Sequence, residues 1–454
     1  MEQDLREVRA KRSGANGQGS GATRRAALQS AGILAAGVLA RPAGGVTVNE
    51  PLALFGGKPA VTYPGRKHSE ASRWPIFGPE EETAVLELLR NPGYGPVAAF
   101  ESDWKAFINA PHAKAHCNGT SAIASMFFAL DLPPGSEVMV PSYTFFATVV
   151  PLRLFGLVPV FVDVNPRTLN FDVEDARKRL TKDTKAVFPV HWLGLPCAMD
   201  DVCDFADEHG LAVLEDAAHA HGASLKGKPM GTWGRMSIFS YQTSKPMSAL
   251  EGGMGVYQRR EDYERATTFG HYDLPASFPA GSLYRKYQGT GLGVKLRMHP
   301  MAAALARAQL RKLESRNAEG VARVRRLNDR ITQLSGLSEP PGRPDMKRLY
   351  YSANILNLDE AKAGLSRRAL VKALQAEGVN ARAHTYPLQH ELPLYRDATW
   401  WHHKPVIAEL PGSEEANRTA VSLPYFTSDA PELIEQYALA FEKVWAHRQK
   451  LASL

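Results

Sequence analysis

One lysine stands among small hydroxyl residues in the stretch SYQTSKPMSALEGG, which runs from Ser240 to Gly253. A surface lysine needs no such neighbours. A lysine that is desolvated beside cationic groups has a lowered pKa, and it can act as both a nucleophile and a general base. Glu251, Gly252 and Gly253 can form a tight turn that closes the loop, since glycine permits close backbone approach. Lys245 is therefore a candidate for covalent chemistry.

Two other stretches place polar groups where ligands often bind. CNGTSAIASMFFAL has Gly119, Thr120 and Ser121 directly before an apolar helical run. A helix N-terminus opened by glycine and hydroxyl residues is a ready anion site, although an ordinary helix cap has the same pattern. LAVLEDAAHAHGA ends a buried strand with Glu215 and Asp216. A carboxylate there is costly unless it pairs with a cation, so a structural ion pair or a cap is the alternative to a ligand site.

Alternating strands and helices can bring these groups together. Short β-rich apolar runs recur between about residues 137 and 241, with helix-period stretches at 147–155, 172–180 and 199–210. This alternation predicts βαβ units and a mostly parallel, buried sheet that binds ligands beyond the carboxyl ends of its strands. A long helical stretch follows from about residue 300, and the proline-rich PPGRP then breaks the chain. We expect a large domain at 46–310 and a smaller α+β domain at 311–454.

The composition is that of an ordinary globular chain. Its 454 residues, 44% of them hydrophobic, can bury a large core. Residues 1–45 carry seven basic and three acidic side chains, which contribute +4 of the formal charge of +7. The remaining +3 is too small to indicate a nucleic-acid partner. The three cysteines form no Cys-x-x-Cys pair, so neither a disulfide framework nor a metal site is indicated.

The first 45 residues resemble a targeting leader. Arg24 and Arg25 precede an apolar run from Ala26 to Ala40 that is too short to span a bilayer well. A basic, Gly/Ser-rich region before the run and small residues after it are typical of a twin-arginine export signal, with a cut after Ala40. We expect export to the periplasm and no stable membrane span. The alternative is a disordered basic leader on a cytoplasmic protein.

Two glycine-rich stretches lack the features of nucleotide sites. GASLKGK at 222–228 matches the first seven positions of a phosphate-binding P-loop, but Pro229 stands where a serine or threonine must reach the metal. Its short polar composition predicts a hairpin turn instead. GTGLG at 289–293 is not the dinucleotide fingerprint and follows polar residues rather than a strand. We expect neither stretch to bind a nucleotide.

An anion cradle, a buried aspartate and a lysine in a Ser/Thr-rich loop, in this order, describe a pyridoxal phosphate site. From about Leu52 to the C-terminus, the chain resembles the DegT-type sugar aminotransferase family of pyridoxal-phosphate enzymes, on the motifs CNGTSAIA, PSYTFFAT, EDAAHAHGA, SYQTSKPMSALEGG and YPLQH. The resemblance implies an α/β fold of fold type I. Its large domain would hold a mostly parallel, seven-stranded sheet flanked by helices, followed by a smaller C-terminal α+β domain. It also implies a homodimer with shared active sites.

The resemblance also implies roles for individual residues. Lys245 would hold the cofactor covalently and move the substrate proton, and Asp216 would keep the pyridine nitrogen protonated so that the ring can act as an electron sink. Phe145 falls where the family stacks an aromatic ring on the cofactor, and His219 falls near the cofactor's phenolic oxygen. The phosphate-binding residues implied in the same way are Gly119, Thr120, Ser121, Ser240 and Gln242.

The chain departs from the family pattern in two places. Many relatives have an asparagine that reaches the phosphate of the neighbouring subunit, whereas VKLRMHP here has Lys295, which can still bind phosphate as a point charge. The sequence after Lys245 differs from the commoner Asn-Leu-Thr, which concerns substrate contacts. By family position, His384, Tyr386 and His390 are candidates for lining the acceptor pocket. As isolated residues they are equally suited to packing and capping.

The expected activity is transfer of an amino group from L-glutamate or L-glutamine to a keto sugar or related polyol ketone, as in aminosugar or polysaccharide biosynthesis. In this family the acceptor is often a nucleotide-linked sugar, which an exported enzyme would rarely meet. Either the leader is not an export signal, or the substrate is a free or envelope-bound ketone, or the catalytic role has changed. Two alternatives remain. One is a sugar dehydratase on the same scaffold, whose members have histidine in place of Lys245. The other is a non-catalytic pyridoxal-phosphate-binding sensor or envelope protein, against which the intact Lys245 and Asp216 argue.

Overall fold

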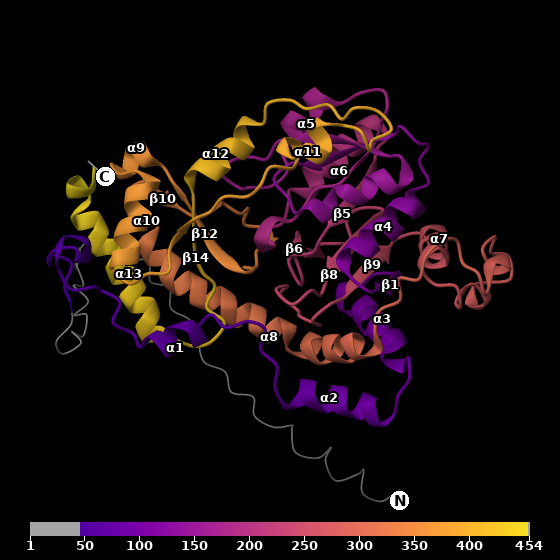
Figure 1. Ribbon diagram of the computed structural model, residues 1–454, viewed down its shortest axis with the longest axis horizontal. Coiled ribbons are helices and arrows are strands. Elements are labelled where there is room, and N and C mark those ends of the chain that lie inside the picture. Colours follow the sequence, from indigo (N-terminus) through magenta and orange to yellow (C-terminus); the bar gives the residue numbers. More distant parts are fainter. Residues whose placement is uncertain (1–45, 453–454) are drawn as a thin grey trace, which may run out of the picture. The chain divides into compact units, whose positions relative to one another are not determined.

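A seven-stranded sheet lies at the centre of residues 46–452, the part of the chain that the computed structural model describes (Figure 1). Its strands are β1 (His112–His116), β2 (Glu137–Pro141), β3 (Val158–Val162), β4 (Thr184–Val187), β5 (Ala212–Asp216), β8 (Met236–Ser240) and β9 (Gly253–Tyr257). Their order is β1-β9-β8-β5-β4-β2-β3, and β9 alone runs against its neighbours among these strands. The predicted mostly parallel sheet is confirmed.

Helices cover both faces of this sheet. They are α3 (Gly95–Ile108), α4 (Gly119–Leu130), α5 (Val173–Arg179), α6 (Met199–His209) and α7 (Arg260–Gly270). Two other helices lie off the sheet: α2 (Pro79–Arg90) packs against the long helix α8 (Pro300–Ile331), and α1 (Gly65–Glu70) packs with the C-terminal part of the chain, where His68 Nε2 lies 2.7 Å from the Tyr437 hydroxyl. Alternate residues of β2 separate two hydrophobic clusters, because successive side chains of a strand point to opposite faces. Met139 packs with residues of α3 and α6, whereas Val138 and Val140 pack with α4. The sheet is therefore buried on both sides, as expected.

Short connections differ from the sequence prediction in one place. The stretch at 147–155, predicted as helical, forms two short 3-10 helices, since Pro151 lacks an N–H to donate and two valines precede it. The 3-10 helices of the described residues are η1 (Ala53–Phe55), η2 (Phe146–Thr148), η3 (Val150–Phe155), η4 (Trp192–Gly194), η5 (Pro275–Ser277), η6 (Arg285–Tyr287), η7 (Gln389–Glu391) and η8 (Arg448–Leu451).

The stretch GASLKGK forms the predicted hairpin. β6 (Ser224–Leu225) and β7 (Lys228–Pro229) pair antiparallel. Lys226 and Gly227 between them both have positive φ, the left-handed conformation that such a turn requires. β11 (Met346–Lys347) pairs with the outer edge of β6. The loop therefore belongs to a small three-stranded sheet.

A long helix, α8 (Pro300–Ile331), connects the central sheet with a second sheet (Figure 1). Its start is capped by His299, whose Nδ1 accepts a hydrogen bond from the Met301 amide at 3.2 Å. The first half of α8 packs with α2 and α3, and the second half packs with the C-terminal helix α13 (Pro431–Ala446). The predicted long helix is confirmed. The expected boundary at residue 310 falls inside it, and this division into two domains stays a prediction.

The second sheet has the order β10-β12-β14-β13 and is antiparallel throughout. Its strands are β10 (Leu337–Ser338), β12 (Ala353–Leu358), β13 (Arg382–Ala383) and β14 (Ala420–Pro424). The remaining helices are α9 (Glu360–Ala363), α10 (Arg367–Ala376), α11 (Pro393–Arg396) and α12 (Pro411–Thr419). Leu52 and Val61 belong to the hydrophobic cluster of this sheet, so the first described segment packs with the C-terminal part of the chain.

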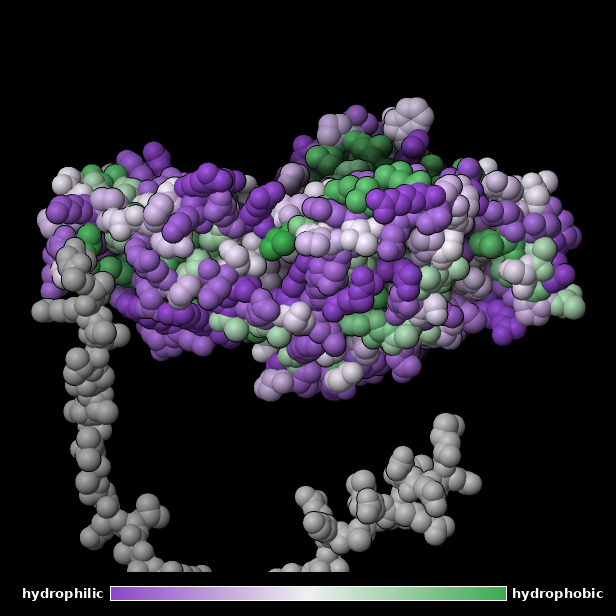
Figure 2. Space-filling view, turned by 90° about the horizontal axis from the view of Figure 1, so that it is seen from below, coloured by the Kyte–Doolittle hydropathy of each residue, from purple (hydrophilic) through white to green (hydrophobic). Residues whose placement is uncertain are grey.

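The apolar run expected to be an export signal lies outside the described residues. Between residues 46 and 452, no helix is long and apolar enough to cross a membrane. The same range contains no group of three or more His, Cys, Asp or Glu side chains arranged to hold a metal ion. The face drawn in Figure 2 is mostly hydrophilic, with hydrophobic residues gathered in separate smaller areas.

A buried ion pair between the end of helix α10 and helix α13 ties the first described segment to the C-terminal part of the chain. The side chains of Glu377 and Lys443 are fully buried, with Oε2 and Nζ 2.9 Å apart. Glu377 also accepts hydrogen bonds from the amides of Ala53 at 2.7 Å and Ala60 at 2.8 Å. Lys443 donates to the carbonyl oxygen of Lys58 at 2.6 Å. Both charges are thus well satisfied, and removal of either partner would leave a buried charge uncompensated.

We expect Glu377→Gln to lower the free energy of unfolding by about 3–5 kcal/mol, since it leaves the buried Lys443 without its counterion. Urea denaturation of the full-length protein measures this. The matched control is Glu70→Gln, which breaks the exposed pair of Glu70 with Arg66 and should change stability little. Equal stability of Glu377→Gln and the wild type would show that the pair does not anchor this segment.

Candidate active site

Lys245 lies in the loop between β8 and β9, with its main chain fixed at both ends. Its amide donates to the Gln242 carbonyl oxygen at 2.8 Å, and its own carbonyl oxygen accepts from Trp74 Nε1 at 3.0 Å. Its Nζ lies 5.2 Å from the ring centroid of Tyr351. Burial lowers the pKa of Lys245 to about 8, although the charge of Asp216 opposes the shift. Near neutral pH the amine therefore has a neutral fraction that an ordinary lysine lacks.

Asp216 is buried at the carboxyl end of β5, beside this amine. Its Oδ1 accepts from the Ala218 amide at 3.1 Å and its Oδ2 from Thr148 Oγ1 at 2.8 Å. Burial raises the pKa of Asp216, while the hydrogen bonds from Thr148 and Ala218 and the charge of Lys245 lower it. The fold thus brings together an aspartate and a lysine that lie 29 positions apart in the sequence.

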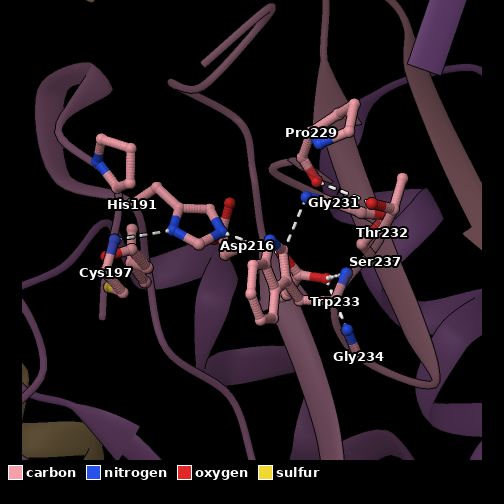
Figure 3. Close-up of polar contacts among 12 residues, drawn as sticks. His191, Cys197, Asp216, Pro229, Gly231, Thr232, Trp233, Gly234 and Ser237 are labelled. Atoms are coloured by element: carbon pink, nitrogen blue, oxygen red, sulfur yellow. Dashed lines mark hydrogen bonds and ion pairs between the residues drawn. The ribbon is translucent and has the colours of Figure 1, made fainter. Parts of the chain in front are cut away.

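The preceding residue, Glu215, is held from the opposite side of β5. Its Oε1 accepts from the amides of Trp233 and Gly234, and its Oε2 accepts from the amide of Gly231, each at 2.7 Å. The loop before β8 therefore wraps around this carboxylate (Figure 3). Because Glu215 and Asp216 are adjacent on one strand, anchoring the first side chain also fixes the direction of the second.

His191 completes this anchor. Its Nδ1 accepts a hydrogen bond from the Cys197 amide at 3.1 Å (Figure 3), which leaves the proton on Nε2. Nε2 then donates to Glu215 Oε2 at 3.2 Å. The backbone amide of His191 also donates to the carbonyl oxygen of Asp216 at 3.2 Å. The loop after β4 is thereby locked to the end of β5.

The start of α4 lies against the end of β8. Asn118 caps the helix, since its Oδ1 accepts from the Ser121 amide at 2.9 Å. The amides of Gly119 and Thr120, the first two residues of α4, have no carbonyl partner within the helix. A Cβ on Gly119 would lie 2.9 Å from the Ser240 Cβ, so a side chain cannot be accommodated there. The result is a narrow, amide-lined cradle suited to an anion.

The turn after Lys245 needs its glycines. A Cβ on Gly252 would lie 2.6 Å from Met298 Cε, and a Cβ on Gly253 would overlap the carbonyl oxygen of Asn118. Gln242, a candidate phosphate ligand, instead uses its Oε1 to accept from the Ser244 amide at 2.8 Å and the Ser244 hydroxyl at 2.7 Å. Its contact with phosphate stays a prediction.

Two aromatic candidates have different surroundings. Phe145, beyond the carboxyl end of β2, is 49% exposed, with its ring centroid 4.4 Å from that of Phe146. An aromatic face in this position is available to a flat ligand. His219 is buried and stacks on Tyr351, with ring centroids 4.5 Å apart. Burial, followed by the charge of the nearby lysine, holds the pKa of His219 well below its usual range, so the ring is neutral.

The three acceptor candidates do not lie in one environment. Tyr386 packs edge-on against Trp192, with ring centroids 4.9 Å apart, and His384 lies 6.5 Å from the same indole. His390 is buried elsewhere, with its Nδ1 2.7 Å from Ser142 Oγ at the end of β2. The first two thus share a cluster, whereas His390 holds the segment before α11 against the sheet. Contact of any of them with the acceptor stays a prediction.

Lys295 lies apart from the Lys245 loop. It is exposed and, with Glu251 and Cys117, lines a shallow surface cavity of about 550 Å³. This cavity shares no lining residue with the one beside Lys245. Within one subunit, the structure therefore does not bring Lys295 to the lysine.

A cavity of about 330 Å³ lies beside the Lys245 loop and was not foreseen from the sequence. Its walls come from five separate segments of the sequence, so no local sequence pattern marks it. Trp74, an isolated tryptophan followed by proline, was the one available signal. Thr148 donates a hydrogen bond to Asp216 and lies inside the PSYTFFAT motif, but nothing in its sequence context marks it as a site residue. Residues lining the cavity include Trp74, Arg316, Asn317, Tyr350, Tyr351 and Tyr425.

These groups fit pyridoxal phosphate. The glycine cradle at the start of α4 suits its phosphate, and the exposed face of Phe145 suits its ring. Asp216 keeps lone pairs free for a ring nitrogen, and the Lys245 amine can bond to its aldehyde carbon. The donor set therefore matches both ends of the cofactor.

Known proteins match the chain over most of its length. The sequence profile of the DegT/DnrJ/EryC1/StrS aminotransferase family matches residues 78–440. The spore coat polysaccharide biosynthesis protein SpsC of Bacillus subtilis is 30% identical over 383 residues, covering 82% of this chain and 96% of that protein. A putative L-glutamine:3-amino-2,3-dideoxy-scyllo-inosose aminotransferase of Streptomyces kanamyceticus is 30% identical over 417 residues, covering 89% and 93%.

Solved structures agree with these relatives. The crystal structure of DesI, determined in the presence of its TDP-sugar product, has a TM-score of 0.72 at 30% identity and covers 88% of this chain and 98% of that chain. The family match spans the start of α4, Asp216 and the Lys245 loop alike. The fold is fold type I, as expected. The chain belongs to the DegT/DnrJ/EryC1/StrS aminotransferase family and is a pyridoxal-phosphate-dependent aminotransferase.

Proposed function

We propose that this aminotransferase moves the amino group of L-glutamate or L-glutamine to the carbonyl carbon of a keto sugar or a related cyclic polyol ketone. The observation that carries the proposal is the Lys245 amine, with its lowered pKa, beside the buried carboxylate of Asp216. The donor is supported by the relative named for L-glutamine. The acceptor class is supported by that relative, named for an inosose, and by DesI, solved with a TDP-sugar.

Each residue of the site would perform one task. When bound, pyridoxal phosphate carries the amino group between donor and acceptor and withdraws electrons from the reacting carbon. The amides of Gly119 and Thr120, at the positive end of α4, would hold its phosphate. Asp216 would hold a proton on the ring nitrogen, and Phe145 would lie against the ring. Neutral Lys245 would take the proton from the substrate carbon and return it.

We expect Lys245→Ala to lower the rate of amino transfer by about 10²–10⁴-fold, because it removes the group that moves the proton. Single-turnover reactions with L-glutamate or L-glutamine measure this, with chromatography of the acid-released cofactor to detect its amine form. Lys362→Ala, at an exposed lysine, is the matched control. A wild-type rate in Lys245→Ala would exclude this role, and a wild type indifferent to every donor would favour the non-catalytic sensor.

The same lysine gives the site a pH dependence. Because the pKa of Lys245 is lowered to about 8 and the neutral amine is the reactive form, covalent attachment of pyridoxal phosphate to the apoenzyme should speed up as pH rises through about 8. Asp216→Asn removes the charge that raises the pKa of Lys245, so the midpoint should move to lower pH. A midpoint that stays or moves upward would contradict their coupling.

The cavity beside the Lys245 loop supports a single-ring acceptor. Its volume of about 330 Å³ stands near the lower end of the range of ligand sites, roughly 300–1,000 Å³. Trp74 and Tyr351 offer aromatic faces, and Arg316 and Asn317 add polar groups. We propose that it receives the ring of the keto sugar or polyol. A nucleotide attached to that ring would need further space.

The leader favours the same class of acceptor. We propose that the pair Arg24 and Arg25, ahead of the apolar run at 26–40, directs export. An exported aminotransferase would rarely meet a nucleotide-linked sugar, so a free or envelope-bound ketone is the acceptor we propose first. Comparison of a free polyol ketone with a nucleotide-linked keto sugar as acceptors tests this choice directly.

We expect Trp74→Ala to raise the KM for the ketone about tenfold, the equivalent of 1.4 kcal/mol, while the reaction with the amino donor changes less. Trp74→Phe keeps an aromatic face but loses the hydrogen bond to the Lys245 carbonyl oxygen, so it separates stacking from loop positioning. Trp400→Ala, at a tryptophan that is 64% exposed, is the matched control. Equal loss of both half-reactions in Trp74→Ala would assign the indole to the loop alone.

We also propose a homodimer in which Lys295 of the partner subunit reaches the cofactor phosphate. Lys295 is exposed in a cavity whose rim includes the exposed side chains of Leu89 and Tyr94. Cys117, one residue before the cap of α4, lines the same cavity. An apolar rim beside the anion cradle is the surface on which a second subunit would be expected.

We expect Lys295→Ala to raise the dissociation constant of pyridoxal phosphate about tenfold, through loss of a charge-assisted contact. Equilibrium dialysis measures the constant, and light scattering measures the mass of the assembly. Lys286→Ala is the control, at another exposed lysine. A monomeric wild type, or an unchanged constant in Lys295→Ala, would refute the shared site.

A further inference from the structure

A chain of two buried hydroxyl groups ends on Asp216. Thr148 Oγ1 lies 2.8 Å from Asp216 Oδ2, and Thr144 Oγ1 lies 2.9 Å from Thr148 Oγ1. Thr144 and Thr148 are each 1% exposed and Asp216 is 5% exposed. Within residues 46–452, neither hydroxyl makes another hydrogen bond. The chain is therefore isolated from solvent, and its protons have only these acceptors.

The direction of the chain depends on the charge of Asp216. An ionised carboxylate can only accept, so Thr148 donates its one proton to Asp216 and accepts the proton of Thr144. The hydroxyl protons of Thr144 and Thr148 are then both donated in hydrogen bonds. If Asp216 carried a proton on Oδ2 and donated it to Thr148, the order would reverse and the Thr144 proton would have no acceptor. A buried donor without a partner is costly, so the arrangement favours the ionised carboxylate.

The backbone fixes both hydroxyls on one side of a single turn. The Thr144 amide donates to the Ser142 carbonyl oxygen at 2.9 Å, and the Thr148 amide donates to the Phe145 carbonyl oxygen at 3.1 Å. The buried side chain of Gln389 clamps the turn, since its Nε2 donates to the Thr144 carbonyl oxygen at 2.9 Å. The ring of Phe145 stays exposed on the same segment. One turn therefore presents both an aromatic face and the hydroxyl chain.

Other charged or titratable groups also face Asp216. They are Lys245 from the loop after β8, His191 from the loop after β4, and Tyr386 from the segment before α11. Both ring nitrogens of His191 are engaged elsewhere, since Nδ1 accepts from the Cys197 amide and Nε2 donates to Glu215. Once Lys245 is bonded to the cofactor, it is no longer a free ammonium beside Asp216. Thr148 and the Ala218 amide are then the donors that remain on the carboxylate.

We propose that Thr148, oriented by Thr144, is a positioning residue that keeps Asp216 ionised and thereby holds the proton on the ring nitrogen of bound pyridoxal phosphate. The inference rests on the proposed function, in which Asp216 is the partner of that nitrogen. Thr148 itself need not touch the cofactor. Its effect is carried by one hydrogen bond to a charged group, which is stronger than a bond between neutral groups.

The test uses the full-length holoenzyme, reconstituted with pyridoxal phosphate that carries ¹⁵N in its ring. The ¹⁵N chemical shift in solid-state NMR reports whether the ring nitrogen is protonated. Thr148→Val keeps the shape of the side chain but removes the hydrogen-bond donor. The equilibrium constant for the proton's distribution between the ring nitrogen and Asp216 should therefore change about tenfold or more in favour of Asp216, and the ¹⁵N resonance should move toward that of neutral pyridine. Thr148→Ser should restore the wild-type position, and Thr144→Val should give a smaller displacement.

Two further variants make the outcome decisive. Thr267→Val is the matched control, because Thr267 is fully buried and its hydroxyl has no hydrogen-bond partner in the part of the chain that the structure describes. It should leave the resonance in place. If Asp216→Asn leaves the ¹⁵N resonance unchanged, Asp216 is not the partner of the ring nitrogen, and the inference fails together with that part of the proposed function. If Asp216→Asn moves the resonance and Thr148→Val does not, the hydroxyl chain alone is refuted. Should Thr148→Val not fold, an unshifted resonance in Thr144→Val refutes the chain equally.

Discussion

The arrangement of the active site depends on the hydrogen bonds that hold the buried carboxylate of Glu215. A charge without access to water is stable only when its lone pairs are filled, and here three backbone amides and His191 fill them. These bonds fix the loop before β8 and the loop after β4 against the end of β5. Asp216, the next residue, must then project from the other side of the strand, toward Lys245. Asp216, the proposed partner of the cofactor's ring nitrogen, is thus positioned by Glu215, which lies on the opposite side of β5.

Much of the central sheet could be predicted from the sequence, because β2, β3, β4, β5 and β8 are short apolar runs separated by helical periods. The two strands at its other edge could not. β1 has the sequence HAKAH, and its Lys114 is buried only because its Nζ pairs with Glu101 at 2.8 Å. β9 has the sequence GMGVY, with glycines at positions where a strand normally packs a side chain. In both cases pairing with a neighbouring strand outweighs a weak local preference.

The active site, like the sheet, has a part that the sequence predicts and a part that it does not. Three site elements follow local sequence patterns: a loop for Lys245, a strand end for Asp216 and a helix cap for the start of α4. The order of these patterns along the chain indicated a pyridoxal phosphate site. The contacts that tune them join distant segments. Thr148 is 68 residues from Asp216, and Trp74 is 171 residues from Lys245. No spacing rule connects such pairs, since their proximity follows from the packing of the whole sheet.

The continuous helix α8 has a consequence for how substrates are chosen. A helix of 32 residues extends for about 48 Å and resists bending. Its two halves belong to different hydrophobic clusters, and Arg316, midway along it, lines the cavity beside Lys245. The part of the cavity wall that α8 contributes is therefore set when the protein folds, and it needs little further ordering when a ligand binds. If the acceptor binds in this cavity, as proposed, the enzyme would distinguish acceptors by the size of their ring rather than by closing around them.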